Sequence, residues 1–170
     1  MSVSAVTDAK ELLSWRQVKL LWILLAVVLV ISALGYAKER WAFGLNMTES
    51  LPHWAFIVDS QHRPGRGDAA MFEVPDNPYY PDQPFVKRIA GIAGDRIENR
   101  DGEIFVAGRS IGIAKSHARD GRPLAAISDQ IIPAGYVFMT GTHVDSYDSR
   151  YAEIGLVPLE RVMGRAHPVL

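Results

Sequence analysis

The sequence of 170 residues contains no cysteine. Thiol catalysis, disulfide bonds and zinc sites built on cysteine are therefore excluded. Neither sign of charge is in excess, because 18 lysine and arginine residues face 19 aspartate and glutamate residues and the formal net charge is −1. Proteins that hold nucleic acid through a bulk positive field carry a basic excess, so we expect no nucleic-acid partner.

Charge is also missing from one long stretch near the N-terminus. Residues 20–37 are 18 consecutive uncharged and mostly apolar residues between two lysines. As a helix they would span roughly 27 Å, close to the hydrocarbon thickness of a bilayer. A secretory signal peptide is the alternative, because Gly35-Tyr36-Ala37 resembles a small-x-small cleavage site. The apolar run is longer than that of most signal peptides, which favours a retained transmembrane anchor.

The basic residues around this run predict its orientation. Three lysines or arginines lie on its N-terminal side and two follow it closely, and the side with more of them tends to stay in the cytoplasm. We therefore expect residues 1–19 in the cytoplasm, residues 20–37 in the membrane and residues 38–170 as one exported domain.

The expected exported domain consists of short apolar runs separated by turn-forming residues, without a long segment of helical period. This pattern favours a mainly β fold, a compact barrel or sandwich. The clearest hairpin joins residues 96–99 to residues 103–106 through Asp101-Gly102. The apolar runs that we expect as strands are residues 54–58, 69–74, 85–93, 104–106, 125–127 and 136–140.

Ser50 is the first candidate for chemistry, in a polar loop between the apolar run and the first expected strand. Pro52 favours an extended conformation at Leu51, so Ser50 lies on a stiffened turn. Its hydroxyl is a candidate nucleophile, and the alternative is an ordinary turn residue.

Lys87 is the second candidate. Strand alternation places it on the same face as Phe85 and Ile89, two large apolar residues. If that face is buried, the pKa of the lysine falls and the amine becomes a base near neutral pH. The alternative is a strand on a half-solvated edge, with Lys87 extending its amine into water.

The third candidate is the polar loop of residues 141–150, which follows the last expected strand. Its carboxylates and hydroxyls, with Arg150 two residues after Asp148, are suited to a hydrogen-bonded scaffold. An Asx-rich surface loop is the alternative.

Two further arrangements use the same loop. Ser50, His143 and either Asp145 or Asp148 are the residue types of a Ser-His-Asp triad, which is recognised by geometry and not by order along the chain. The histidine and the two aspartates also form a weak metal-binding pattern.

In this order the three stretches resemble type I signal peptidases, membrane-bound serine endopeptidases that use a serine/lysine pair. Ser50-Leu51-Pro52 resembles their nucleophile box. Lys87-Arg88-Ile89 with Gly91 and Gly94-Asp95 resembles their lysine box. Residues 138–150 and then Gly164-Arg165-Ala166 resemble their final box. Within that family the match is closest to the compact TraF-type peptidases of conjugative transfer, which mature pilin subunits.

The resemblance implies a role for each residue. Ser50 would attack the scissile carbonyl, and Lys87 in its neutral form would take the serine proton. Thr48 would help to hold the oxyanion together with the backbone N–H of Ser50. Ser146 would orient the lysine amine. Asp148 with Arg150 would hold the loop in place. The family needs no cofactor and no metal.

The resemblance also implies partners and a location. The substrate would be a membrane-inserted precursor, a propilin or another protein with a signal peptide, bound as an added strand. The protein would sit in the bacterial inner membrane as a single-pass protein, with its catalytic domain on the periplasmic side and components of conjugation or type IV secretion as further partners. The cleaved pilin would be linear or cyclic. A housekeeping signal peptidase and a non-catalytic β-domain of an envelope secretion assembly are the alternatives.

Overall fold

The computed structural model describes residues 14–45, 50–74 and 83–169. The chain divides into two compact units, Met1–Glu39 and Arg40–Leu170. Helix α1 (Trp15–Arg40) makes up nearly all that is described of the first unit, and it buries none of its side chains. It is the one helix among the described residues that is long and apolar enough to cross a membrane, and it includes the predicted anchor of residues 20–37. An apolar surface all round a helix is typical of a membrane span.

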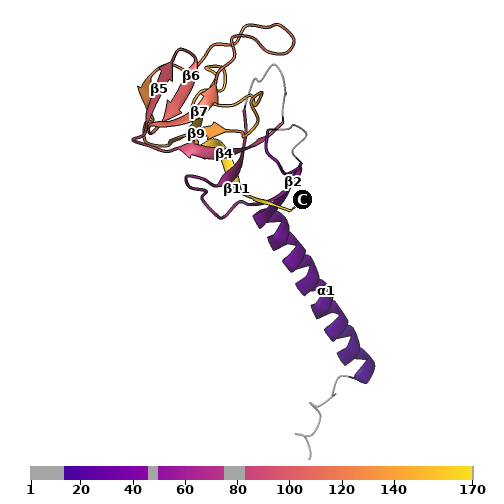
Figure 1. Ribbon diagram of the computed structural model, residues 1–170. Helices are drawn as coiled ribbons and strands as arrows, with labels where there is room; N and C mark the ends of the chain where they lie inside the picture. The colour runs from indigo at the N-terminus through magenta and orange to yellow at the C-terminus, as the bar shows by residue number, and fades with distance from the viewer. Residues whose placement is uncertain (1–13, 46–49, 75–82, 170) are drawn as a thin grey trace, which may run out of the picture. The chain divides into compact units, whose positions relative to one another are not determined.

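The second unit is built from two antiparallel sheets (Figure 1). The larger sheet has seven described strands in the order β1-β2-β11-β3-β4-β9-β10. A short 3-10 helix (Leu159–Arg161) connects its last two strands along the chain. The strands of this sheet are β1 (Trp41–Leu45), β2 (Ala55–Asp59), β3 (Ala69–Phe72), β4 (Phe85–Gly91), β9 (Tyr136–Thr140), β10 (Val157–Pro158) and β11 (Val162–Pro168).

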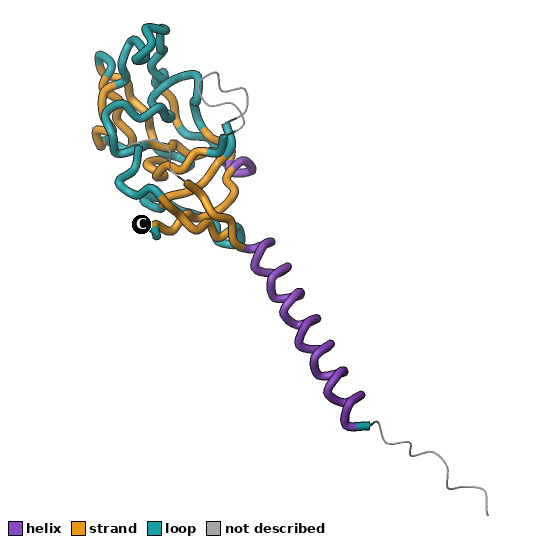
Figure 2. The backbone as a smooth tube through the Cα atoms, turned by 90° about the vertical axis from the view of Figure 1, so that its right-hand side faces the viewer, coloured by secondary structure: helices purple, strands orange, loops and turns teal. Residues whose placement is uncertain are grey.

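The smaller sheet comprises β5 (Arg96–Arg100), β6 (Glu103–Val106), β7 (Arg109–Ile113) and β8 (Gln130–Ile131) in the order β7-β6-β5-β8. The predicted hairpin is confirmed as the pair β5 and β6. Asp101 and Gly102 both have positive φ, 52° and 89°, as a two-residue type I′ turn requires. Long loops connect the strands of both sheets, as the tube in Figure 2 makes clear.

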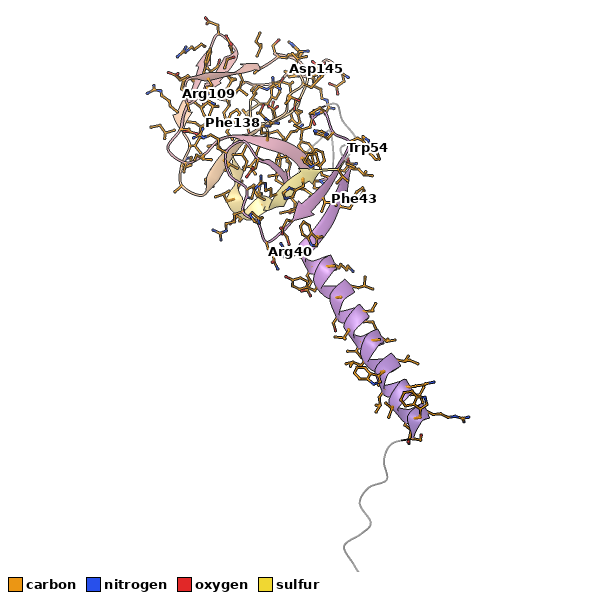
Figure 3. All side chains as sticks on the ribbon, turned by 60° about the horizontal axis from the view of Figure 1, so that its bottom comes forward. Arg40, Phe43, Trp54, Arg109, Phe138 and Asp145 are labelled. Carbon is orange, nitrogen blue, oxygen red and sulfur yellow. The ribbon has the colours of Figure 1, made fainter. Side chains whose placement is uncertain are left out.

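Strand β9 ties the two sheets together because its side chains alternate between two cores. Phe138 is fully buried in a cluster with Ile97 and Ile104 of the smaller sheet, and it lies inside the domain in Figure 3. Its neighbour Met139 packs with Ile89 in a separate cluster. The end of β9, from which the polar loop departs, is therefore held firmly on both sides.

The expected fold class, mainly β after one N-terminal apolar helix, is confirmed. Five of the six predicted strands are present, with ends that move by no more than two residues in any of them. The prediction of a strand at 125–127 is wrong, because Ala126 forms only an isolated bridge with Tyr151. There the chain runs past the end of the polar loop and exchanges too few backbone hydrogen bonds to form a ladder. The sequence analysis did not identify β1, β7, β8, β10 or β11.

Candidate active site

Lys87 lies on β4, which is an inner strand between β3 and β9. Only 4% of Lys87 is exposed. Its Nζ donates a hydrogen bond of 3.0 Å to Ser146 Oγ. The interpretation of this segment as a half-solvated edge strand is therefore wrong, because a neighbouring strand pairs with each edge of β4.

Burial changes the proton affinity of this amine. Loss of hydration lowers the pKa of Lys87 from its ordinary value of 10.5 to about 8. The nearby Asp148 carboxylate raises the pKa of Lys87, whereas the Arg150 guanidinium lowers it together with burial. The Phe85 ring, whose centre is 5.5 Å from Nζ, is part of the apolar surroundings. With a pKa near 8, roughly one-tenth of the amine is neutral at pH 7, several hundred times the neutral fraction of a solvated lysine.

The loop that carries Ser146 is held by a buried ion pair. Asp148 is fully buried and Arg150 is 2% exposed. Arg150 donates from Nε and Nη2 to the two carboxylate oxygens of Asp148, at 2.9 and 3.0 Å. The same Nη2 donates to the Ser146 backbone oxygen at 2.7 Å, and Asp148 Oδ2 accepts from Gly141 N at 2.9 Å. The loop is therefore an internal scaffold and not an Asx-rich surface loop.

Ser50 contacts this scaffold from a distant part of the sequence. It is 4% exposed. Its backbone oxygen accepts hydrogen bonds from Thr142 N at 2.7 Å and from Thr142 Oγ1 at 3.3 Å. A Cβ added to Gly141 would overlap with Ser146 Oγ and would lie 2.7 Å from Ser50 O. The Ser50 backbone and the Ser146 side chain thus both lie close to Gly141, where a Cβ would project, and Ser146 accepts the hydrogen bond from Lys87.

The remaining predicted site residue is Thr48, which lies outside the described residues. Thr142 is the residue that sequence analysis missed. Thr142 and Ser50 are 92 residues apart in sequence. A local sequence pattern cannot predict a hydrogen bond from a side chain to such a distant backbone oxygen.

The geometry does not support the Ser-His-Asp alternative. The Asp145 carboxylate is paired with Lys115 and with Arg119, the latter at 2.7 Å. Hydrogen bonds from Lys115 and then Arg119 lower the pKa of Asp145 to about 2. His143 Nδ1 accepts a hydrogen bond of 3.1 Å from the Asp145 backbone N–H, so this nitrogen does not donate to a carboxylate. Asp148 is engaged by Arg150.

A metal site also lacks support in the described part of the chain. Within those ranges, no three histidine, aspartate or glutamate side chains are grouped so that they could hold a metal ion. The carboxylates of the polar loop are instead neutralised by arginine and lysine side chains.

Comparison with known proteins gives a family match and several relatives. A family model described as "Signal peptidase, peptidase S26" matches residues 14–170. The conjugal transfer protein TraF of Agrobacterium fabrum is 27% identical over 146 residues, which cover 75% of this chain and 81% of that protein. The TraF protein of Agrobacterium tumefaciens is 25% identical over 173 residues, which cover 91% and 97%.

Two further similarities are to proteins whose names refer to signal peptidases. A probable signal peptidase I-2 of Synechocystis is 34% identical over 85 residues, 48% of this chain and 36% of that protein. The crystal structure of a signal peptidase I from Enterococcus faecalis has 26% sequence identity and a TM-score of 0.41, and the match covers 60% of this chain and 95% of that chain. The family match in residues 14–170 includes every candidate site residue.

Proposed function

The chain belongs to the signal peptidase family, peptidase S26, and we propose that Ser50 and Lys87 are its nucleophile and general base. The resemblance of its motifs to signal peptidases is thereby confirmed, and the serine/lysine pair is the proposal. The observation that carries it is the buried Lys87 amine, whose pKa is about 8 and which is bound to the hydroxyl of Ser146. An amine at this pKa takes a proton from a serine without the help of histidine.

The proposed reaction proceeds in two steps. Ser50 Oγ attacks the scissile carbonyl carbon while its proton passes to Lys87 Nζ, and the backbone N–H of Ser50, with Thr48, stabilises the oxyanion. Lys87 then gives the proton to the leaving amine as the peptide bond breaks. In the second step water, or an amine of the substrate, attacks the ester and gives a proton to Lys87 Nζ; the bond to Ser50 Oγ breaks, and Lys87 returns the proton to that oxygen, which restores the free enzyme. Ser146 and the Asp148–Arg150 pair keep the lysine amine oriented.

The proposed substrates are exported proteins of conjugative transfer. Two relatives that are named conjugal transfer proteins match this chain over 81% and 97% of their own length. We propose that the chain removes a signal or propilin segment, with cyclisation as a second outcome when an amine resolves the acyl-enzyme. A housekeeping signal peptidase would instead process many unrelated precursors.

The proposed location is the bacterial inner membrane. Residues 20–37 of α1 would be the anchor, with residues 1–19 in the cytoplasm and residues 38–170 on the periplasmic side. Large apolar side chains of the second unit, among them Phe43 and Trp54, are exposed and available to the bilayer surface. Components of a type IV secretion assembly would be neighbours in the same membrane.

The test is cleavage of a membrane-inserted precursor by the full-length chain. Ser50→Ala and Lys87→Met should each abolish cleavage, and Lys87→Arg should fail as well because a guanidinium stays protonated. Ser128→Ala removes an exposed hydroxyl and should cleave at the normal rate. Mass spectrometry of the products separates linear from cyclic ends. Cleavage that persists in Lys87→Met would refute the proposed base, and wild-type protein that cleaves no precursor would favour a binding module.

A further inference from the structure

An open pocket of about 210 Å³ lies beside the candidate active site. Its wall includes Pro52 and His53, which follow Ser50 closely along the chain, and Arg88, which follows Lys87. The start of β3 and the last residues of β11 complete it. We call it the Arg88 pocket. The reaction proposed above gives no role to this pocket or to Arg88.

The charges around the Arg88 pocket do not cancel. Arg165 donates to Asp68 at 2.9 Å, so these two opposite charges compensate each other. Asp68 Oδ2 also accepts from the Gly65 backbone N–H at 2.9 Å. Arg88 is exposed, and within the described ranges its guanidinium has no hydrogen bond and no ion pair. The pocket therefore carries one uncompensated positive charge.

The position of the pocket links it to a peptide bound at Ser50. Neighbouring side chains on a strand point to opposite faces, so Arg88 projects away from the face of Lys87 and shares a face with Val86. Leu51, the residue after Ser50, packs on that face with Val86. Successive residues of an extended peptide advance by about 3.3 Å. Leu51 and Pro52 line the pocket and directly follow Ser50, so the pocket begins one residue along the chain from the candidate nucleophile. An extended peptide that passes Ser50 and continues along Leu51 and Pro52 would bring a side chain to the pocket a few residues from the cleaved bond.

We propose that the Arg88 pocket binds the side-chain carboxylate of an acidic residue within a few residues of the cleaved bond. This inference rests on the proposed peptidase function and names a feature of its substrates. A planar guanidinium donates two parallel hydrogen bonds to a carboxylate, which a neutral or basic side chain cannot accept. A lysine or arginine of the substrate at the same position is repelled, so the pocket selects against basic precursors as well.

The test uses the full-length protein in neutral detergent and peptides that are amidated at the C-terminus. In each peptide one residue is Glu or Gln, and this residue is placed in turn at the four positions on either side of the cleaved bond. At one position the Glu peptide should have a kcat/KM about tenfold higher than the Gln peptide, equivalent to about 1.4 kcal/mol. In Arg88→Gln the ratio should fall to near one. In Arg88→Glu a Lys peptide should become the better substrate.

Because each ratio compares two peptides on the same protein sample, partial loss of folded protein does not alter it. Arg109→Gln removes an exposed arginine of β7 in the smaller sheet and should keep the wild-type ratio (Figure 3). The preference for Glu should also weaken at high salt, as expected for a partly exposed ion pair.

Two results would overturn the inference while the proposed function stands: cleavage with no preference for Glu at any position, or a preference that survives in Arg88→Gln. If Arg88→Gln weakens binding to vesicles of anionic lipid and leaves the peptide ratio unchanged, the guanidinium binds lipid headgroups and the inference is also wrong. If the wild-type protein cleaves no peptide but processes an inserted precursor, substrate recognition depends on other parts of the precursor and the inference is wrong. Absence of all cleavage would overturn the proposed function together with this inference.

Discussion

The fold surrounds the amine of Lys87 with strands and an aromatic ring. Lysines usually keep their charged end in water, and removing that water penalises the charged form. The hydrogen bond to Ser146 Oγ replaces one contact with water. The result is an amine that is poised between its two protonation states at a pH close to neutral.

Cleavage should therefore depend steeply on pH. Only the neutral amine acts as a base, and the pKa of Lys87 is about 8, so kcat/KM should fall about tenfold for each pH unit below 7. The measurement is kcat/KM for one peptide between pH 5 and pH 9. A rate that stays flat down to pH 5 would contradict the role proposed for Lys87.

The same shift predicts an effect on stability. Burial lowers the pKa of Lys87 in the folded state from 10.5 to about 8, so between these pH values the unfolded chain binds more protons than the folded chain. The contribution of Lys87 to folding is thus most unfavourable below pH 8, by about 3 kcal/mol, and this penalty disappears as the pH rises to 10.5.

Lys87→Met removes the titrating group and should abolish that dependence. The free energy of unfolding, measured with denaturant at several pH values, should rise less between pH 8 and pH 10 in Lys87→Met than in the wild-type protein. Other lysines and tyrosines titrate in both proteins and cancel in the difference. Parallel curves for the two proteins would show that the amine is not desolvated.

Among the elements, strand β4 and the polar loop show how far local pattern predicts the site. Alternation along β4 correctly placed Lys87 beside Phe85 and Ile89, but alternation alone leaves open whether that face is buried. The answer depends on β3 and β9 lying on either side of β4 and on Ser146, which is 59 residues away in sequence. The order of strands in a sheet is set by long-range packing, and no local pattern contains it.

The strands that sequence analysis missed have a related explanation. Strand β11 contains Gly164, Arg165 and His167, residues that interrupt an apolar strand pattern. It is nevertheless an inner strand between β2 and β3. Only two of its seven residues are buried, Gly164 and Ala166. Backbone pairing on both edges, and not an apolar face, therefore holds β11 inside the sheet.

The polar loop should lose its shape when its ion pair is broken. Asp148→Asn leaves the Arg150 guanidinium buried without a counter-charge, which typically costs about 3 to 5 kcal/mol. We expect unfolding at lower denaturant concentration. Arg119→Gln, at an exposed arginine that pairs with Asp145 of the same loop, should cost less than about 1 kcal/mol. Equal losses in the two variants would contradict the distinction between the buried and the exposed pair.

At the scale of the whole molecule, the domain leaves large apolar side chains uncovered near the start of its larger sheet. Phe43 on β1 is 66% exposed, and Trp54 just before β2 is 57% exposed. Both are labelled in Figure 3. An aromatic residue in such a place gains by entering the boundary between headgroups and acyl chains.

Replacement of both by serine should affect membrane substrates selectively. In Phe43→Ser/Trp54→Ser, cleavage of a membrane-inserted precursor should fall severalfold, and kcat/KM for a short soluble peptide should change little. The matched control is Ile113→Ser, which removes an apolar side chain that is 60% exposed on β7 of the smaller sheet. A proportional loss on both substrates would indicate damage to the fold and not to membrane contact.

The contact between Ser50 and Thr142 has a consequence for the history of each new molecule. A ribosome makes Ser50 early and adds its partner 92 residues later. The proposed catalytic site is therefore incomplete until residue 142 has been synthesised, because the contact that holds the Ser50 backbone does not exist before then. On the proposed function, a partly synthesised chain would have no peptidase activity.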